Sequence, residues 1–260
     1  MYRNTGQYII AFLFFSALIL YWQATALARV LWGHRWGEVA VTLDQTDAKL
    51  ASGIGAYYFN GGAYNLDIAE KAYRKAVTID PRIFWGHYQL ARIYFIEGKF
   101  DQAISETAKE LGANPGNLRT LYVRGLIYGT QGDLVKAEDN FRRFTEWAPS
   151  EWAGYNDLAW VYSKDGKFKE AKETIRLAMR KIPNADTNPW LWNALGVAEL
   201  NLGEKDAQNS FESALNLAHH LSLQDWYKAY PGNQKDDAAQ GLDQFKAAIK
   251  ENLRRSEAFR

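Results

Sequence analysis

This chain of 260 residues contains no cysteine. Without thiols it has no disulfides, no thiolate metal sites and no thiol nucleophile, and the absence is compatible with any redox compartment. An excess of one charge is missing as well, since 31 Lys and Arg face 30 Asp and Glu. No long basic run offers a surface for phosphate backbones, so the sequence does not favour nucleic acid as a partner.

Catalytic signatures are also missing from the sequence. No H-E-x-x-H, G-x-S-x-G or G-x-x-x-x-G-K-[ST] pattern occurs. Of the four histidines, His219 and His220 are adjacent, and neighbours on a helix point to different sides, which disfavours a metal site. The sequence therefore predicts that the chain is not an enzyme and has no catalytic residues, no cofactor, no metal and no small-molecule substrate.

What the sequence does contain is a repeat with a period of 34 residues. Four columns recur in the same register, and they consist of a tyrosine, a glycine, an alanine and a proline: Tyr94, Tyr128, Tyr162; Gly98, Gly132, Gly166; Ala103, Ala137, Ala171; and Pro81, Pro115, Pro149, Pro183. The glycine favours a left-handed turn that ends a first helix, the alanine lets two helices approach closely, and the proline cannot continue the second helix. Each repeat is thus a helical hairpin that must stack on its neighbours.

These columns resemble the tetratricopeptide repeat, a 34-residue unit with the pattern W-x2-L-G-x2-Y, then G-x-Y-x2-A, then F-x2-A and a closing P. Repeat five shows the resemblance at Trp192, Leu195, Gly196, Gly203, Ala207, Phe211 and Ala214, with one residue deleted and His219 in place of the proline. Repeat one, roughly residues 48 to 81, matches at Gly55, Tyr58, Ala69, Tyr73, Ala76 and Pro81. The resemblance covers residues 48–220 and implies an all-α fold, a right-handed superhelical α-solenoid of about five repeats.

Two departures and a tail accompany the repeats. Repeats two and three carry Glu110 and Phe144 where the pattern has a small residue in the second helix, so we expect the contact there to open or repack, with a local change of superhelical curvature. Residues 221–260 are broken at Pro231 and Gly232. The helix that follows has one apolar face and is expected to cap the solenoid; this face consists of Leu242, Phe245, Ile249 and Leu253.

The resemblance also implies a concave groove lined by the first helix of each repeat. Carried over by position, the groove residues are Trp85, Tyr88, Arg92, Phe95, Ile96, Arg119, Tyr122, Leu126, Thr130, Asn156, Trp160, Lys164, Trp190, Asn193 and Asn201. The set is aromatic, basic and amide-bearing, with no acid, and Trp, Tyr and Arg dominate binding energy at interfaces. It predicts a protein partner with an extended or helical segment of acidic character. The alternative at each aromatic position is packing between repeats.

The N-terminal stretch "YIIAFLFFSALILYWQATALA", residues 8–28, is the most apolar part of the chain. No charge lies between Arg3 and Arg29, and 25 helical residues span about 37 Å, enough to cross a hydrocarbon core of about 30 Å. We expect a transmembrane helix over 1–32 and a juxtamembrane linker over 33–47, with an interfacial aromatic belt formed by Tyr21, Trp22, Trp32 and Trp36. Two alternatives remain, namely a signal cleaved at Ala24-Thr25-Ala26 or Ala26-Leu27-Ala28, and a soluble core helix.

Together these features predict a single-pass, membrane-anchored scaffold or adaptor that binds a protein partner in its groove. The short tail before one apolar segment favours repeats on the exported side, as in a bacterial envelope assembly. The alternatives are a cleaved, soluble exported repeat protein and an accessory subunit of an envelope enzyme or of a polysaccharide, secretion or pilus machine.

Overall fold

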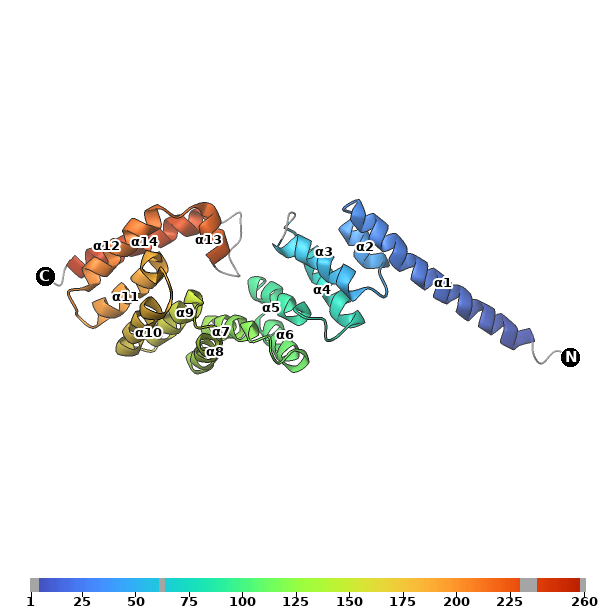
Figure 1. Ribbon diagram of the computed structural model, residues 1–260, viewed down its shortest axis with the longest axis horizontal. Helices are drawn as coiled ribbons and strands as arrows, with labels where there is room; N and C mark the ends of the chain where they lie inside the picture. The colour runs from blue at the N-terminus through green and yellow to red at the C-terminus, as the bar shows by residue number, and fades with distance from the viewer. Residues whose placement is uncertain (1–4, 61–63, 230–237, 258–260) are drawn as a thin grey trace. The chain divides into compact units, whose positions relative to one another are not determined.

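The computed structural model describes residues 5–60, 64–229 and 238–257. Within these ranges every regular element is a helix, as the repeat predicts (Figure 1). The chain divides into two compact units: residues 1–94 with 108–117 form the first unit, and residues 95–107 with 118–260 form the second. The two units are described separately below.

Five helical pairs correspond to the five predicted repeats. They are α3 (Ala48–Asn60) with α4 (Leu66–Ile79), α5 (Gly86–Ile96) with α6 (Phe100–Ala113), α7 (Arg119–Gln131) with α8 (Leu134–Trp147), α9 (Trp152–Lys164) with α10 (Phe168–Lys181), and α11 (Pro189–Asn201) with α12 (Ala207–His219). A one-turn 3₁₀ helix, η1 (Ala185–Thr187), precedes α11. The predicted all-α repeat fold is confirmed.

The glycine column has the backbone conformation that the sequence predicts. After the first helix of four repeats, Gly98, Gly132, Gly166 and Gly203 have φ of +72°, +82°, +73° and +71°. A side chain at such φ is strained by contact between Cβ and the backbone, whereas glycine is not. These turns direct the second helix of each pair back along the first.

The first unit begins with α1 (Thr5–Gly33) and α2 (Gly37–Leu43). The predicted linker over 33–47 therefore contains a helix, and α2 packs against α1 and α4. Ala28 of α1 is fully buried in one cluster with Ala40, Ile54 and Ala72 from α2, α3 and α4. The last third of α1 thus belongs to the core of the first unit.

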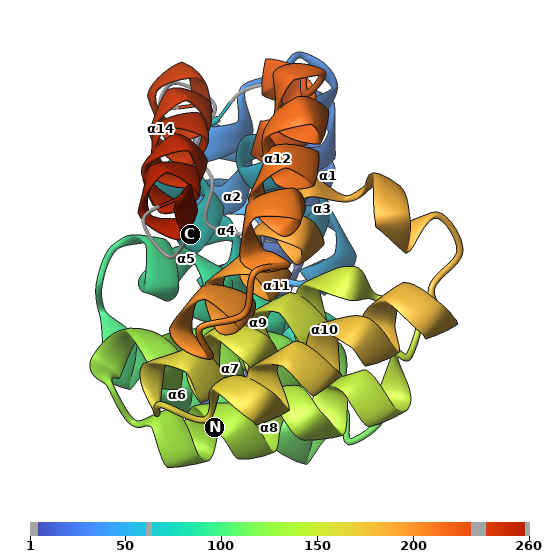
Figure 2. The ribbon, with the colours of Figure 1, turned by 90° about the vertical axis from the view of Figure 1, so that its left-hand side faces the viewer.

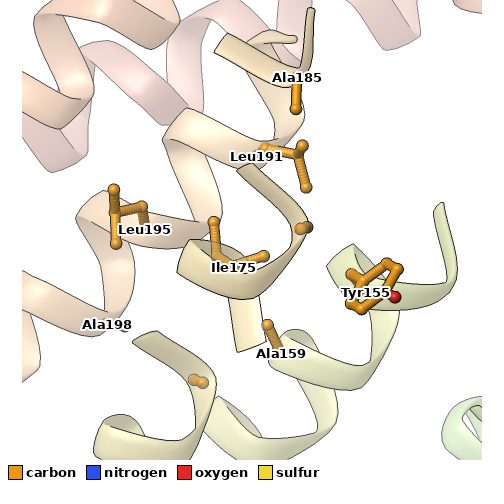
Figure 3. Packing of buried hydrophobic residues seen from close by; sticks show 9 residues of the cluster. Tyr155, Ala159, Ile175, Ala185, Leu191, Leu195 and Ala198 are labelled. Carbon is orange, nitrogen blue, oxygen red and sulfur yellow. The ribbon is translucent and has the colours of Figure 1, made fainter. Parts of the chain in front are cut away.

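The core of the second unit lies between successive helical pairs. Ile175 of α10 is fully buried between side chains of α9 and α11, among them Ala159 and Leu191 (Figure 3). Ala185 of η1 closes the same cluster. Small side chains in this cluster let the helices approach closely, so that the large ones interdigitate at the density of a protein interior.

The C-terminal region contains α13 (Leu223–Ala229) and α14 (Ala238–Glu257). Helix α14 lies alongside α12 (Figure 2), and Ile249 is fully buried against Phe211. Phe245 and Leu253 pack against the same cluster, so the predicted apolar face of this helix covers the last repeat. The breakers Pro231 and Gly232 lie outside the described residues.

The two departures in the second helix are both accommodated by repacking. Glu110 is fully buried and Phe144 is 2% exposed. The Glu110 carboxylate accepts hydrogen bonds from the start of α5, and the ring of Phe144 packs on Tyr122, with 5.0 Å between ring centroids. A Cβ added to Gly154 would lie 2.7 Å from Phe144 Cδ1, so the ring occupies the space that this glycine leaves.

Candidate functional site

A hollow of about 290 Å³ in the second unit brings several predicted groove residues together. Helix α7 contributes Leu126 and Thr130, and helix α9 contributes Asn156, Asp157 and Trp160. Four of these five were predicted as groove residues from their places in the repeat. The first helices of repeats three and four thus present one surface, as the family pattern implies.

Trp160 is the most exposed large side chain of this hollow. It is 41% exposed, and the edge of its ring lies against Gly129, where an added Cβ would be 3.0 Å from Trp160 Cζ3. The Lys164 ammonium is 5.8 Å from the Trp160 ring centroid, within the range of a cation–π contact. The ring is therefore held in place on one side and open to a ligand on the other.

Asp157 is a charged residue of this hollow that the sequence did not predict. It is 7% exposed, and its carboxylate accepts hydrogen bonds from the Tyr122 hydroxyl at 2.7 Å and from Asn156 Nδ2 at 3.1 Å. Tyr122 is itself only 5% exposed, with its ring against Phe141 and Phe144. Asp157 comes directly after a groove position, so the family register gave no reason to select it.

A second group of predicted groove residues lies in the first unit. Tyr88 is 7% exposed and packs edge-on against Trp85, with 4.8 Å between centroids. The Arg92 guanidinium lies 4.5 Å from the Phe59 ring centroid, and Nη1 donates to Asn60 Oδ1 at 3.0 Å. Tyr88 and Tyr122 are therefore packing residues first, as the alternative reading of the aromatic positions allowed.

The remaining predicted groove residues are not gathered in one place. Arg119 forms an ion pair with Glu151 at 2.9 Å. The ring of Phe95 packs near that of Phe100, with 6.2 Å between the ring centroids. Asn193 is half-buried, and the exposed Asn201 donates to the carbonyl of Val197 in its own helix at 2.8 Å.

Trp190 belongs to an aromatic stack rather than to an open groove. Its ring stacks on the rings of Trp152 and Phe245, with 5.1 and 5.6 Å between centroids, and the centroid of the Trp226 ring lies 6.1 Å away. Phe245 and Trp226 come from α14 and α13, so the C-terminal helices of the chain cover this end of the predicted groove. We therefore place the candidate site at Trp160 and not at Trp190.

The N-terminal helix provides a second candidate surface. Its segment Phe12–Gly33 is long and apolar enough to cross a membrane, and the most apolar stretch of 18 residues within it is 13% buried. Phe12, Leu13 and Leu20 are each at least 60% exposed. Core helices and signal sequences meet the same length and composition test, so the contacts of the helix decide what it does.

Polar contacts fix the last third of α1 to the first unit. Thr25 Oγ1 lies 3.2 Å from Asp44 Oδ1, to which it donates, and 3.0 Å from Thr46 Oγ1. Arg29 donates from Nε and Nη2 to Asp47 Oδ2 at 3.0 and 2.7 Å. Burial raises the pKa of Asp47, but hydrogen bonds from the backbone and from Arg29 outweigh it and hold that pKa below its usual value.

The residues of the predicted interfacial belt differ in exposure. Trp32 packs in the core of the first unit, whereas Trp36 is 62% exposed. The side chains of Tyr21 and Trp22 lie outside those that the structure describes. In the described ranges, no three His, Asp or Glu side chains converge to hold a metal ion.

Comparison with known proteins identifies the repeat. One tetratricopeptide-repeat family model matches residues 72–105, and another matches residues 118–151 and 153–181. Among curated proteins, the tetratricopeptide repeat and J domain-containing co-chaperone DNJ1 of Cryptococcus neoformans is 29% identical over 83 residues, 32% of this chain and 16% of that protein. The anaphase-promoting complex subunit CDC16 of Saccharomyces cerevisiae is 25% identical over 151 residues, 58% of this chain and 17% of that protein. The chain thus spans about a sixth of each relative.

Solved structures share the fold at low sequence identity. MamA from Desulfovibrio magneticus superposes with a TM-score of 0.58 at 18% identity, covering 66% of this chain and 95% of that one. YrrB, described as a tetratricopeptide-repeat protein with an unusual peptide-binding site, gives 0.55 at 16% identity, over 67% of this chain and 88% of that one. A tetratricopeptide-repeat protein from Parabacteroides merdae gives 0.53 at 16% identity, over 91% of this chain and 84% of that one.

The family models, the five helical pairs and the left-handed glycine turns agree. The chain therefore contains tetratricopeptide repeats, which the family models match within residues 72–181.

Proposed function

We propose that this protein is a membrane-anchored scaffold that captures a segment of a partner protein in the hollow around Trp160. The observation that carries the proposal is the exposed ring of Trp160 in a hollow shared with Leu126, Thr130 and Asn156. An exposed, positioned tryptophan beside an apolar side chain, with polar groups at the rim, has the composition of an interface hot spot.

The chemistry of the hollow indicates what its partner segment presents. Leu126 and the face of Trp160 suit an apolar or aromatic side chain, and Asn156 at the rim can bond a peptide backbone. The exposed Lys164 beside the ring favours an acidic residue next to that anchor. The peptide-binding site reported for the structurally similar YrrB supports this use of the fold.

Retention of α1 as an anchor is the second part of the proposal. Cleavage after Ala26 would remove Thr25 from the fully buried Asp44, and cleavage after Ala28 would also remove a fully buried core side chain. Loss of a donor to a buried carboxylate destabilises a protein, so the contacts of α1 favour an uncleaved helix over a released signal. An exported orientation in a bacterial envelope assembly is the setting that we propose for this anchor.

The test of the hollow is site-specific photo-crosslinking in native membranes. A photoreactive amino acid at Thr130, at the exposed rim, should give a discrete adduct that disappears when Trp160→Ala is added. The matched control places the same amino acid at Val135, which is 81% exposed on α8 and outside the hollow. Equal adducts at Thr130 and Val135, or adducts unaffected by Trp160→Ala, would contradict the proposal.

Anchoring is tested on the same membranes. Alkaline carbonate should leave the protein in the membrane fraction, and the intact mass should include residues 1–28. Extraction into the soluble fraction, or a mature chain that begins near Leu27 or Arg29, would exclude the anchor and leave the test of the hollow unaffected.

A further inference from the structure

Exposed apolar side chains continue beyond the central part of α1. Leu27 and Val30 on α1, Trp36 in the turn that follows and Val39 on α2 are 50%, 57%, 62% and 47% exposed. We call these four side chains the corner surface. Single exposed apolar residues are ordinary, but these lie within thirteen positions of one another and follow the exposed Ile19 and Leu20 along the chain.

The two faces of α1 differ along its last third. Thr25 and Ala28 point into the first unit, whereas Leu27 and Val30 are exposed. The exposed side has no charged residue from Phe12 to Val30 except Arg29, which is held by Asp47. The nineteen residues from Tyr8 to Ala26, just before the corner surface, are uncharged and helical, and they extend about 28 Å, close to the thickness of a hydrocarbon core. Lipid can therefore cover one side of α1 as far as the corner surface while the other side remains in protein.

The residues next to the corner surface have the chemistry of a lipid headgroup layer. The Arg35 guanidinium lies 5.1 Å from the Trp32 ring centroid and 4.8 Å from that of Tyr57, and both Arg35 and His34 are exposed. Tryptophan and arginine are enriched where an apolar body meets a wet, anionic layer. The exposed acid nearby, Glu38, has Lys71 Nζ at 3.7 Å.

We propose that the corner surface lies in the headgroup and glycerol layer of the bilayer that α1 crosses, so that the first unit sits directly on the membrane. This inference rests on the proposed anchoring. It assigns lipid contact to α2 as well as α1, because Val39 belongs to α2 and Trp36 immediately precedes it. The first unit then has no free linker between span and repeats, because α1 continues into its core.

The absence of cysteine allows a direct test with single-cysteine variants of the full chain. Trp36→Cys and Val39→Cys are labelled with the environment-sensitive dye NBD and reconstituted in phosphatidylcholine vesicles with one-fifth phosphatidylglycerol. Leu18→Cys marks the exposed side of the span, and Val135→Cys is the water-exposed control. NBD at positions 36 and 39 should emit at shorter wavelength than at 135. Lipids with a shallow doxyl group should weaken the NBD emission at positions 36 and 39 about twofold, because interfacial helices bury about 5–10 Å into the headgroup boundary.

Each outcome separates this inference from the anchoring on which it rests. Quenching at 18 by a lipid with a deep doxyl group, without quenching at 36 and 39 by the shallow one, would overturn the lipid contact of the corner surface and leave the anchor intact. No quenching at 18 by either lipid would overturn both. A blue shift at 36 and 39 without quenching by doxyl lipid would show that another protein or a second copy covers the surface, which also overturns the inference.

Discussion

Repeats two and three fill the same structural position in opposite ways. This position lies five residues before the closing proline, or before His219 in repeat five. In repeats one, four and five it is a fully buried alanine, namely Ala76, Ala178 and Ala214. Repeat two has Glu110 and repeat three has Phe144. A small residue here needs nothing from its surroundings, whereas each of these two side chains requires a specific compensation.

Glu110 is compensated by hydrogen-bond donors at the start of α5 and just after α6. Its carboxylate accepts from the backbone N–H groups of Trp85 and Tyr88 at 3.3 and 3.2 Å, and from the side chains of Asn114 and Asn117 at 3.1 and 2.8 Å. Trp85 has φ of +73°, a costly conformation for a residue other than glycine. Glu110 thus provides the cap at the start of α5 that a side chain at the N-cap itself usually gives.

Phe144 is compensated by space in the following repeat. Its ring is 2% exposed and meets Gly154, near the start of α9, where any Cβ would be too close. A buried carboxylate needs hydrogen-bond donors, which here come from the start of α5 and from the turn after α6. A buried ring needs volume, which only the next pair can leave.

The largest effect is expected from removing the carboxylate. Glu110→Ala should lower the free energy of unfolding by about 3–5 kcal/mol, because several buried donors lose their acceptor and a cavity forms. Urea denaturation followed by circular dichroism measures this loss. Hydrogen exchange should show the amides of Trp85 and Tyr88 losing protection first.

Two further variants make the Glu110 result specific. Ser105→Ala on the exposed side of α6 should change stability by less than about 0.5 kcal/mol. Glu110→Gln should be intermediate, because the amide keeps one acceptor oxygen and places an NH₂ group among donors. A Glu110→Ala chain as stable as Glu110→Gln would show that these hydrogen bonds contribute little.

A smaller effect is expected on the aromatic side of the comparison. Gly154→Ala should cost about 1–3 kcal/mol, because its Cβ forces the buried Phe144 ring to move. Phe144→Leu in the Gly154→Ala background should recover part of that loss, which makes the two changes strongly non-additive. The double-mutant cycle is measured by the same urea denaturation.

Gly53 in the middle of α3 is the matched control, because an added Cβ would meet nothing within 4 Å. Gly53→Ala should stabilise the protein by about 0.5–1 kcal/mol through helix propensity. If Gly154→Ala stabilises the protein as much as Gly53→Ala does, the space left by Gly154 is not needed to accommodate the Phe144 ring.

The smallest effect is expected at Glu199, a third buried side chain that has fewer donors. It is 1% exposed and accepts from Ser210 Oγ at 2.6 Å and Arg176 Nη2 at 3.3 Å. Burial raises the pKa of Glu199 above its usual value, and the hydrogen bond from Ser210 and the charge of Arg176 oppose this only in part. We expect Glu199→Gln to lie within about 1 kcal/mol of the parent chain at pH 7.

The sign of the pH dependence follows from the raised pKa. The native state favours the protonated carboxyl of Glu199. The contribution of this group to the free energy of unfolding is therefore fully present below the usual glutamate pKa of about 4.3, and it is lost as pH rises through the raised pKa. Glu199→Gln has no such loss. Unfolding free energies at pH 4 and pH 7 should therefore show the variant gaining on the parent chain as pH rises, and a constant difference would contradict the raised pKa.

The sequence predicted the features that local physics decides. The glycine column gave the left-handed turns at Gly98, Gly132, Gly166 and Gly203, and helical periodicity gave the apolar face of α14. At Glu110 and Phe144 it predicted only that the contact would open or repack. The donors at Trp85 and Tyr88 are backbone groups, which no residue type encodes.

The candidate site was predictable in part. The family register selected Leu126, Thr130, Asn156 and Trp160, which do share one hollow. It also selected Tyr122 and Trp190, which pack inside the second unit. Periodicity identifies the face of a helix, but it does not show that Asp157 engages the Tyr122 hydroxyl or that C-terminal helices cover Trp190.

The match between Phe144 and Gly154 limits how this array can be shortened or rearranged. The residue corresponding to Gly154 is Thr120 in repeat three and Leu191 in repeat five, both fully buried. Excision of repeat four would bring Leu191 against the Phe144 ring, so the loss of 34 residues in frame would not leave a working four-repeat protein. The repeats share the outline of a helical hairpin, but their order cannot be changed freely.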